Sequence, residues 1–346
     1  MRAVVLRGGE LSVRETADPV PGPGELLLKV LSTAICASDV HFMDDHDEVP
    51  AGAMAGMLYD AERDIVLGHE FVGEVVGHGP DCSDQFPVGT RVTSMPVRPV
   101  NGGVDGLRTI GQHPDAQGSF GELLVVHEML ARQVPDGVSS DAAALVDAFA
   151  VGEFYVRCSR IAPGEMPIVI GAGAIGLSTI ASLVARSIDP IIVADFNPER
   201  RALALDFGAH IAVDPAVQSP FAAWRETALT RPPSGPAVVY ECVGKPGLLQ
   251  EIVDTCDPWS RIFCAGGWYT GDVLQCTAAT HKGVTIQFGG GPMPEDWYGT
   301  LDAISAGRLD PLPSVGRVIG LDDVPAALDE ARRSQGPPRT VVHPQA

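Results

Sequence analysis

The chain has 346 residues and a formal net charge of -20, with 45% hydrophobic and 20% charged residues. This composition is typical of a globular protein, and the length favours two domains. The negative charge argues against nucleic acid or an anionic membrane surface as a partner. The cysteines form no CxxC pair, which fits a reducing compartment, and we expect a cytoplasmic protein.

Short apolar runs separated by turn residues fill the chain from Met1 to about Leu145. Clear examples are Ala3–Leu6, Leu26–Val30, Phe71–Val76 and Leu123–Val126. Short strands at this spacing predict a mostly antiparallel, barrel-like domain.

Two groups of polar residues interrupt this domain. Cys36, Ser38 and His41 follow one predicted strand, and His69 and Glu70 directly precede another. A thiolate and an imidazole from separate loops are two of the three protein ligands that a catalytic zinc needs. Each residue also has an ordinary interpretation: a lone buried cysteine acts as a small hydrophobe, and a lone histidine as a structural hydrogen-bonding group. On the same grounds Ser38 fits a turn and His41 a solvated surface.

The stretch from Pro167 to Asp195 has the pattern strand, glycine-rich turn, helix, strand. The turn consists of Gly171, Ala172, Gly173, Ala174, Ile175 and Gly176. In a dinucleotide-binding unit such glycines allow a tight turn, close approach of a pyrophosphate and close packing of helix on strand. Asp195 follows the last glycine by about 20 residues, where a carboxylate accepts bonds from the adenosine ribose and repels a 2′-phosphate. The pattern therefore favours NAD over NADP.

Two other interpretations of this stretch stay open. A buried glycine-rich turn also occurs in other α/β proteins. Residues 166–185 carry no charge and are long enough to cross a bilayer. The glycines at turn spacing and the strand–helix rhythm argue for the dinucleotide-binding unit. After it, Asn197 and Pro198 predict the start of a helix that stops at Gly208.

Four motifs occur in a characteristic order: CASDVH at 36–41, GHEFVGEVVGHG at 68–79, VGTRV at 88–92 and GAGAIG at 171–176. Together they resemble the zinc-dependent alcohol dehydrogenases of the medium-chain dehydrogenase/reductase superfamily, over nearly the full length of the chain. The resemblance implies an α/β protein with two domains. These are a GroES-like, mostly-β catalytic domain at 1–147, completed by about 292–346, and a Rossmann domain with a doubly wound parallel sheet at 148–291.

The resemblance assigns the metal ligands residue by residue. Cys36 and His69 match two ligands of the catalytic zinc. Glu70 matches the acid beside the metal, either linked through water or an occasional ligand. Asp147 matches the third ligand, which is a cysteine or an acid in the family; its alternative role is to cap the helix that follows. A thiolate, an imidazole and a carboxylate on Zn²⁺ give a formally neutral centre.

Other roles also follow from the resemblance. Ser38 would hydrogen-bond the substrate oxygen and relay its proton, through the cofactor ribose, to His41 at the surface. Arg200 matches a basic residue near the adenosine ribose. Val243 belongs to a loop that would face the nicotinamide, and Arg339 in the closing strand matches a cofactor-facing arginine.

One departure from the family pattern concerns the structural zinc. Many members carry four closely spaced cysteines on a lobe that binds this second metal. Residues 93–118 correspond to the lobe and contain no cysteine. We therefore expect one zinc per chain, and we interpret His113 as a surface loop residue.

A second departure is the long interval between Cys36 and His69. The additional residues, 42–65, carry an acidic patch at 44–48, which we interpret as a solvated charged loop. They also contain an apolar face at helical spacing, consisting of Met54, Met57 and Leu58. Because this insertion connects two ligands, it is our candidate for substrate selection or subunit contact.

The resulting prediction is an enzyme that transfers hydride reversibly between an alcohol and NAD, with one catalytic Zn²⁺ per chain. The acidic third ligand and the missing lobe favour secondary alcohols or polyols as substrates, by analogy. We expect a small-molecule substrate and a homodimer or homotetramer. The alternatives are a zinc-free quinone or enoyl reductase of the same superfamily and a non-catalytic NAD-binding protein.

Overall fold

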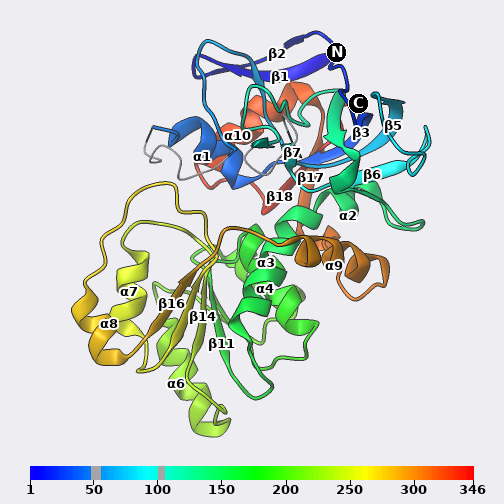
Figure 1. The fold of residues 1–346 in the computed structure, drawn as a ribbon. Coiled ribbons are helices and arrows are strands. Elements are labelled where there is room, and N and C mark those ends of the chain that lie inside the picture. Colours follow the sequence, from blue (N-terminus) through cyan, green and yellow to red (C-terminus); the bar gives the residue numbers. More distant parts are fainter. Residues whose placement is uncertain (48–55, 100–105) are drawn as a thin grey trace. The chain divides into compact units, whose positions relative to one another are not determined.

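The computed structural model describes residues 1–47, 56–99 and 106–346 (Figure 1). The chain divides into two compact units. The first comprises Met1–Asp147 and Val315–Ala346, and the second comprises Ala148–Ser314.

The first unit consists mainly of antiparallel strands, as the spacing of its apolar runs predicts. Its larger sheet contains β3 (Glu25–Ala34), β5 (Glu70–His78), β6 (Arg91–Ser94), β9 (Leu123–His127), β10 (Ala131–Gln133), β17 (Val315–Ile319) and β18 (Arg339–Val342). The strand order is β10-β6-β5-β3-β18-β17, with β9 also paired to β3. A second sheet, of order β2-β1-β4, contains β1 (Arg2–Arg7), β2 (Glu10–Glu15) and β4 (Ile65–Val66). A separate pair is formed by β7 (Val97–Pro99) and β8 (Leu107–Thr109).

The core of this unit follows from side-chain alternation along the strands. In β3, Leu26, Leu28 and Val30 are fully buried, whereas Lys29 between them is exposed. This period of two places one face of the strand against the barrel interior. Among the described residues of the first unit, the helices are α1 (Ala37–Asp44), α2 (Ser140–Ala144) and α10 (Val324–Arg332), with short 3₁₀ turns η2 (Glu128–Leu130) and η4 (Leu321–Asp323).

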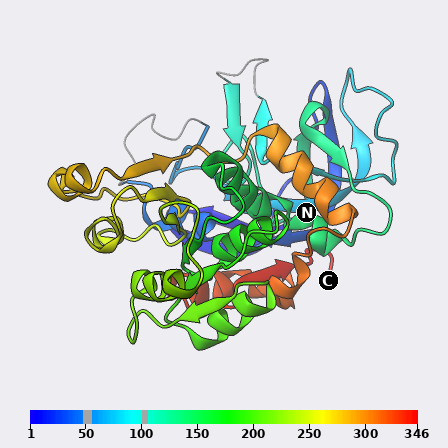
Figure 2. The ribbon, with the colours of Figure 1, turned by 90° about the horizontal axis from the view of Figure 1, so that it is seen from below.

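The second unit is a doubly wound parallel sheet, which confirms the predicted Rossmann fold class. Its strands are β11 (Pro167–Ile170), β12 (Ile192–Ala194), β13 (Ile211–Val213), β14 (Val238–Glu241), β15 (Arg261–Cys264) and β16 (Thr285–Phe288). Their order is β13-β12-β11-β14-β15-β16, and all neighbours are parallel, with β13 and β16 at the two edges (Figure 2). The order reverses between β11 and β14, and ligands of such sheets bind outside the carboxyl ends of the strands at this point.

Helices cover both faces of this sheet (Figure 1). They are α3 (Val146–Ser159), α4 (Ala174–Val184), α5 (Pro198–Asp206), α6 (Pro220–Thr230), α7 (Leu248–Thr255), α8 (Cys276–Lys282) and α9 (Pro294–Ser305), with the 3₁₀ turn η3 (Leu312–Ser314). One apolar core joins α3, α4 and α5 to the sheet, and a second joins α6, α7 and α8 to its other face. Each face is therefore buried, which explains the continuous apolar runs of the strands.

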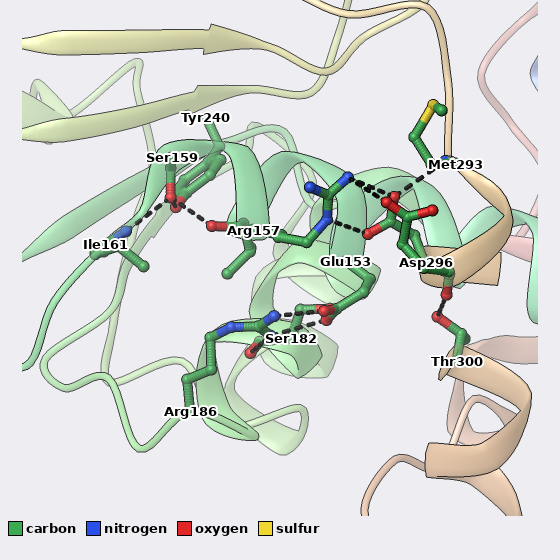
Figure 3. Close-up of polar contacts among 12 residues, drawn as sticks. Glu153, Arg157, Ser159, Ile161, Ser182, Arg186, Tyr240, Met293, Asp296 and Thr300 are labelled. Carbon is green, nitrogen blue, oxygen red and sulfur yellow. Dashed lines mark hydrogen bonds and ion pairs between the residues drawn. The ribbon is translucent and has the colours of Figure 1, made fainter. Parts of the chain in front are cut away.

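Ion pairs tie α3 to its neighbours within this unit (Figure 3). Arg157 donates to both carboxylate oxygens of the buried Asp296, over 2.5 and 2.8 Å. Asp296 also accepts the Met293 N–H at the start of α9. Arg186, two residues past the end of α4, pairs with Glu153. These contacts fix α3 against both α4 and α9.

The apolar stretch 166–185 does not form one long helix. It folds as strand β11, the glycine-rich turn and helix α4. Within residues 1–47, 56–99 and 106–346, no helix has the length and apolar character needed to cross a membrane.

Candidate active site and metal centre

Cys36 lies at the junction of β3 and α1. It is the N-cap residue of α1, with an extended backbone, and its N–H donates to Asp39 Oδ2 over 3.0 Å. This bond is half of a capping box, which fixes the start of the helix. The Cys36 side chain is thereby placed at a helix N-terminus, where a thiolate is favoured.

His69 is placed by an unusual run of backbone just before β5. Gly68 has φ of +91°, and a Cβ there would lie 2.7 Å from the Phe120 ring. A Cβ on Gly118 would lie 2.3 Å from the Leu67 carbonyl oxygen. Only glycine fits at both positions, so the segment around Gly118 packs directly on the backbone that leads into His69.

The His69 imidazole is held on both sides. Its Nδ1 lies 3.1 Å from Asp39 Oδ1, and its Nε2 lies 3.2 Å from Ser38 Oγ. His69 is 6% exposed and Asp39 is fully buried. A carboxylate on one ring nitrogen fixes the tautomer and directs the other nitrogen toward a metal.

Asp39 is a residue that the sequence prediction did not assign to the site. Its signal was an acid three residues after an N-cap position, which is the spacing of a capping box. Its contact with His69 depends on the fold and could not be seen in the motif.

Glu70 and Arg339 form a buried ion pair in the same unit. Each is the first residue of its strand, β5 or β18, and Arg339 is 2% exposed. Glu70 Oε1 is also buried and has no hydrogen-bond partner in the described part of the chain. A buried carboxylate oxygen without a partner is rare and indicates a ligand that the protein itself does not supply.

The electrostatics of the cluster favour a thiolate at Cys36. Burial would raise the pKa of this thiol, but the hydrogen bond and charge of His69 and the charge of Arg339 lower it below its usual value. Burial likewise opposes a charged His69, yet Asp39 and Cys36 raise the pKa of the imidazole well above its usual value. The thiolate is the form that binds a metal.

The donor atoms fit a zinc ion. Ligand atoms of Cys36, His69 and Glu70 all lie within 4.8 Å of one another. Two donors on one tetrahedral zinc lie about 3.5 Å apart, so small side-chain rotations would let these groups share an ion. Sulfur, imidazole and carboxylate are also the donors that zinc takes in proteins.

Asp147 does not belong to this group of three. It lies half-buried in the first turn of α3. Its role as the third ligand stays a prediction from the family resemblance.

His41 lies one turn after Ser38 on α1. Its Nδ1 is 2.6 Å from Asp45 Oδ2, and its side chain is 36% exposed. Residues three apart on a helix are neighbours on one face, so Ser38 and His41 point to the same side of α1.

The insertion between the ligands is described in part. Asp44, from the predicted acidic patch, pairs with Arg332 of α10 over 2.6 and 2.8 Å. Met57 and Leu58 lie outside any helix, so the predicted helical spacing does not apply to them. Glu48 and Met54 lie outside the described residues.

The glycine-rich turn of the second unit has the form that a pyrophosphate requires. Gly171 has φ of +91°, and a Cβ on Gly176 would lie 1.9 Å from the Gly171 carbonyl oxygen. Gly173 is the N-cap of α4, forms no side-chain capping bond, and a Cβ there would meet nothing within 4 Å. The space beside Gly173 at the N-terminus of α4 is therefore open, as anion binding at a helix N-terminus needs.

Asp195 stands at the expected place, directly after β12. Its Oδ2 accepts the Ala172 N–H and its Oδ1 accepts the Asn197 N–H, each over 2.8 Å. The acid and the glycine-rich turn are therefore brought together. Carboxylate oxygens have further lone pairs with which to accept ribose hydroxyl groups.

Arg201 stabilises the turn that follows β12, and it was not among the predicted site residues. Its guanidinium donates to the carbonyl oxygens of Asp195 and Phe196, over 2.8 and 2.9 Å. Arg200, the predicted cofactor residue, lies in the first turn of α5, where its N–H donates to Asn197 Oδ1. Because Arg200 and Arg201 are adjacent, the sequence alone does not show which of them contacts the turn after β12.

Val243 and Arg339 complete the predicted cofactor residues. Val243 follows β14 and is 45% exposed. Arg339 lies in the first unit, where it contacts Glu70.

The interpretation of His113 as a surface residue was wrong. The residue is 5% exposed, and its Nδ1 accepts the Asp115 N–H over 3.0 Å. A tight turn closed by a bridge between His113 and Ala116 places the imidazole inside the unit.

Comparisons with known proteins identify the family of this chain. The alcohol dehydrogenase GroES-like domain matches residues 22–136, and the zinc-binding dehydrogenase domain matches residues 174–306. L-threonine 3-dehydrogenase from Escherichia coli (strain K12) is 31% identical over 348 residues, or 97% of each chain. The chain belongs to the zinc-dependent alcohol dehydrogenases of the medium-chain dehydrogenase/reductase superfamily. The family and enzyme class predicted from the sequence are confirmed.

Solved structures resemble this alcohol dehydrogenase over its whole length. 2R,3R-butanediol dehydrogenase from Bacillus subtilis has a TM-score of 0.83 at 25% identity, covering 99% of both chains. A Sinorhizobium meliloti 1021 protein described as a zinc-binding dehydrogenase, bound to NADP, has a TM-score of 0.81 at 25% identity, again over 99% of both chains. The family thus provides zinc and a nicotinamide dinucleotide as the cofactors.

Proposed function

We propose that this alcohol dehydrogenase oxidises secondary alcohols or polyols with NAD, at a zinc held by Cys36, His69 and a carboxylate. The observation that carries the proposal is the convergence of Cys36, His69 and Glu70 within 4.8 Å, with Asp39 behind the imidazole. The alternatives of a zinc-free reductase and a non-catalytic protein have no use for this buried donor set.

The third ligand is a choice between two acids. Asp147 has the position expected from the family. Glu70 is already within reach, but its ion pair with Arg339 offsets its charge. We therefore assign Asp147 as the third ligand and Glu70 as the acid beside the metal.

When bound, zinc acts as a Lewis acid that lowers the pKa of an alcohol, and the nicotinamide accepts the hydride. The chain would supply the groups that handle the proton. Ser38 Oγ lies beside His69 Nε2 and would accept the hydroxyl proton of the substrate while giving its own proton, through the cofactor ribose, to His41. His41 would then pass that proton to solvent, because its imidazole is partly exposed and is held by Asp45.

The preference for NAD rests on Asp195. A carboxylate beside the glycine-rich turn would accept bonds from the ribose hydroxyl groups and repel the 2′-phosphate of NADP. The NADP-bound relative makes this a point to test, because members of one family differ in their cofactor.

The substrate class is proposed from chemistry and from two relatives. The hydroxyl at C3 of L-threonine and both hydroxyls of 2R,3R-butanediol are secondary alcohols, and the corresponding dehydrogenases align over nearly the whole chain. We expect an enzyme of the cytoplasm that forms a homodimer or homotetramer.

Metal analysis together with a panel of alcohols, diols and polyols, followed by NADH absorbance, tests the proposal. We expect one zinc per chain and turnover of secondary hydroxyls. Cys36→Ser should remove zinc and turnover, whereas Cys276→Ser, at an exposed cysteine, should leave both unchanged. Full turnover by the Cys36 variant would overturn the assignment, and two zinc ions per chain would contradict the expected single metal.

A further inference from the structure

Glu241, the last residue of β14, is a fully buried carboxylate with an unusual set of partners. Its Oε1 accepts the N–H groups of Val243 and Gly244, over 2.7 and 2.8 Å. Gly244 has φ of +71°. Two successive N–H groups that converge on one oxygen form a small anion-binding concavity, and the Glu241 carboxylate fills it from within the protein.

The main chain of the same residue holds a second loop. The Glu241 carbonyl oxygen accepts the N–H groups of Ala265 and Gly266, over 2.7 and 2.8 Å. These residues directly follow β15. Glu241 therefore accepts hydrogen bonds from four N–H groups. These groups belong to the loops that follow the neighbouring strands β14 and β15.

The two loops touch each other through backbone alone. A Cβ on Gly244 would lie 2.1 Å from the Gly267 carbonyl oxygen, and one on Gly266 would lie 2.3 Å from the Gly244 nitrogen. Distances this short leave no room for a side chain at either glycine, so the backbones of the two loops lie against each other.

A buried carboxylate is a costly way to stabilise a loop. Burial raises the pKa of Glu241, although the two N–H groups and the Trp268 indole lower it. Glu241 Oε2 and Trp268 Nε1 are both buried and lack a hydrogen-bond partner of ordinary geometry within the described residues. Packing alone would favour an apolar residue at this position. The free-energy cost of burying the Glu241 carboxylate therefore indicates that the protein needs the two loops held in place.

These loops leave the carboxyl ends of β14 and β15, beside the point where the strand order reverses between β11 and β14. Ligands of doubly wound sheets bind at this edge. Val243 remains 45% exposed there, and its N–H donates to Glu241 Oε1.

We propose that Glu241 is a positioning residue that holds the 243–244 and 265–266 loops as one rigid surface for the nicotinamide half of the dinucleotide. The inference rests on the proposed use of a nicotinamide cofactor. It assigns no contact between Glu241 and the cofactor, because the carboxylate acts through the two loops.

Titrations with NADH and with ADP-ribose, which lacks the nicotinamide, separate this role from a purely structural one. In Glu241→Ala, NADH should bind about tenfold more weakly, the change that corresponds to about 1.4 kcal/mol or one net hydrogen bond. ADP-ribose should bind as before, because its contacts lie at the glycine-rich turn and Asp195. Glu241→Gln keeps an acceptor oxygen and should restore most of the NADH affinity.

Tyr240→Phe is the matched control. Tyr240 is the neighbouring residue on β14, is equally buried, and bonds to Ser159 Oγ over 2.7 Å (Figure 3). Its loss should lower the melting temperature without changing the ratio of NADH to ADP-ribose affinity. If Glu241→Ala fails to fold, Glu241→Asp gives the same test, because its shorter side chain keeps the charge and cannot reach both N–H groups.

Equal loss of both ligands in the Glu241 variants, or unchanged NADH affinity, would overturn the positioning role. Failure of the unaltered protein to bind NADH would instead refute the proposed cofactor. The two failures are thus distinguishable in one set of titrations.

Discussion

Replacing Asp39 by alanine tests whether the zinc site depends on support from behind His69. Asp39 is fully buried and bonds to both predicted ligands, through Oδ1 to His69 Nδ1 and through Oδ2 to the Cys36 N–H. Alanine removes both bonds and leaves the thiol and the imidazole in place. The variant therefore weakens the site without deleting a donor.

The expected magnitude follows from the two bonds. Loss of the outer partner of a ligating histidine costs about 10- to 100-fold in metal affinity or activity, which is about 1.4–2.8 kcal/mol. The bond to the Cys36 N–H belongs to the capping box of α1, and loss of one such hydrogen bond costs about 0.5–1.5 kcal/mol of stability. We expect zinc affinity to fall by the first amount and the melting temperature to fall modestly through the second.

Competition with a coloured chelator measures the zinc dissociation constant, and denaturant unfolding measures stability. Asp39→Asn should lose less, because its amide oxygen can still accept the His69 Nδ1–H. Asp44→Asn is the matched control on the same helix. Asp44 bonds to Arg332 near the surface, and such a pair contributes about 0–1 kcal/mol, so zinc affinity should not change.

A zinc dissociation constant that is the same in Asp39→Ala and the unaltered protein would refute the reasoning. It would mean that His69 is oriented by packing alone. A zinc affinity that falls no further in Asp39→Ala than in Asp44→Asn would have the same meaning.

Three further results are expected. Asp195→Ala should reduce the preference for NAD⁺ over NADP⁺, measured as a ratio of kcat/KM values, and an unchanged ratio would remove Asp195 as the discriminator. Gly118→Ala places a Cβ 2.3 Å from a carbonyl oxygen and should cost about 1–3 kcal/mol and lower zinc content, whereas Gly299→Ala, with free space around its Cβ, should keep both. Glu25 is buried and bonds twice to Arg98; burial raises its pKa, but Arg98 and a backbone N–H lower it below the usual value. Its contribution to stability is therefore present above about pH 4.5 and lost as the pH falls below that value, so Glu25→Gln should unfold with a weaker acid dependence than the unaltered protein, and equal dependence would contradict the assignment.

The secondary structure of the second unit could be predicted because its signals are local. Asn197 caps α5 by accepting the N–H groups of Glu199 and Arg200, and Gly208 ends the helix with φ of +100°. Both roles need only neighbouring residues. The same holds for the glycine-rich turn. Gly171 adopts the positive φ, Gly173 leaves space at the N-terminus of α4, and Gly176 allows the helix to pack closely on the turn.

The metal site could be predicted only in part, because it depends on strand register. Ala34 of β3 pairs with Glu70 of β5, and this register brings Cys36 and His69 together from segments far apart in sequence. The family motifs provided the two ligands, but a single sequence does not reveal the register. Asp39 was missed for this reason, since its second partner lies across that pairing.

The region that lacks the structural-zinc cysteines is also fixed by contacts between segments far apart in sequence. The Gly118 and Phe120 N–H groups donate to the carbonyl oxygens of Val66 and Leu67, over 2.7 and 2.9 Å. Gln117 Oε1 accepts the Val66 N–H over 2.5 Å. The segment therefore runs along the backbone that leads to His69, which is why His113 is buried rather than exposed. Hydrogen bonds and glycine contacts therefore fix this segment against the backbone that leads to His69, the predicted zinc ligand.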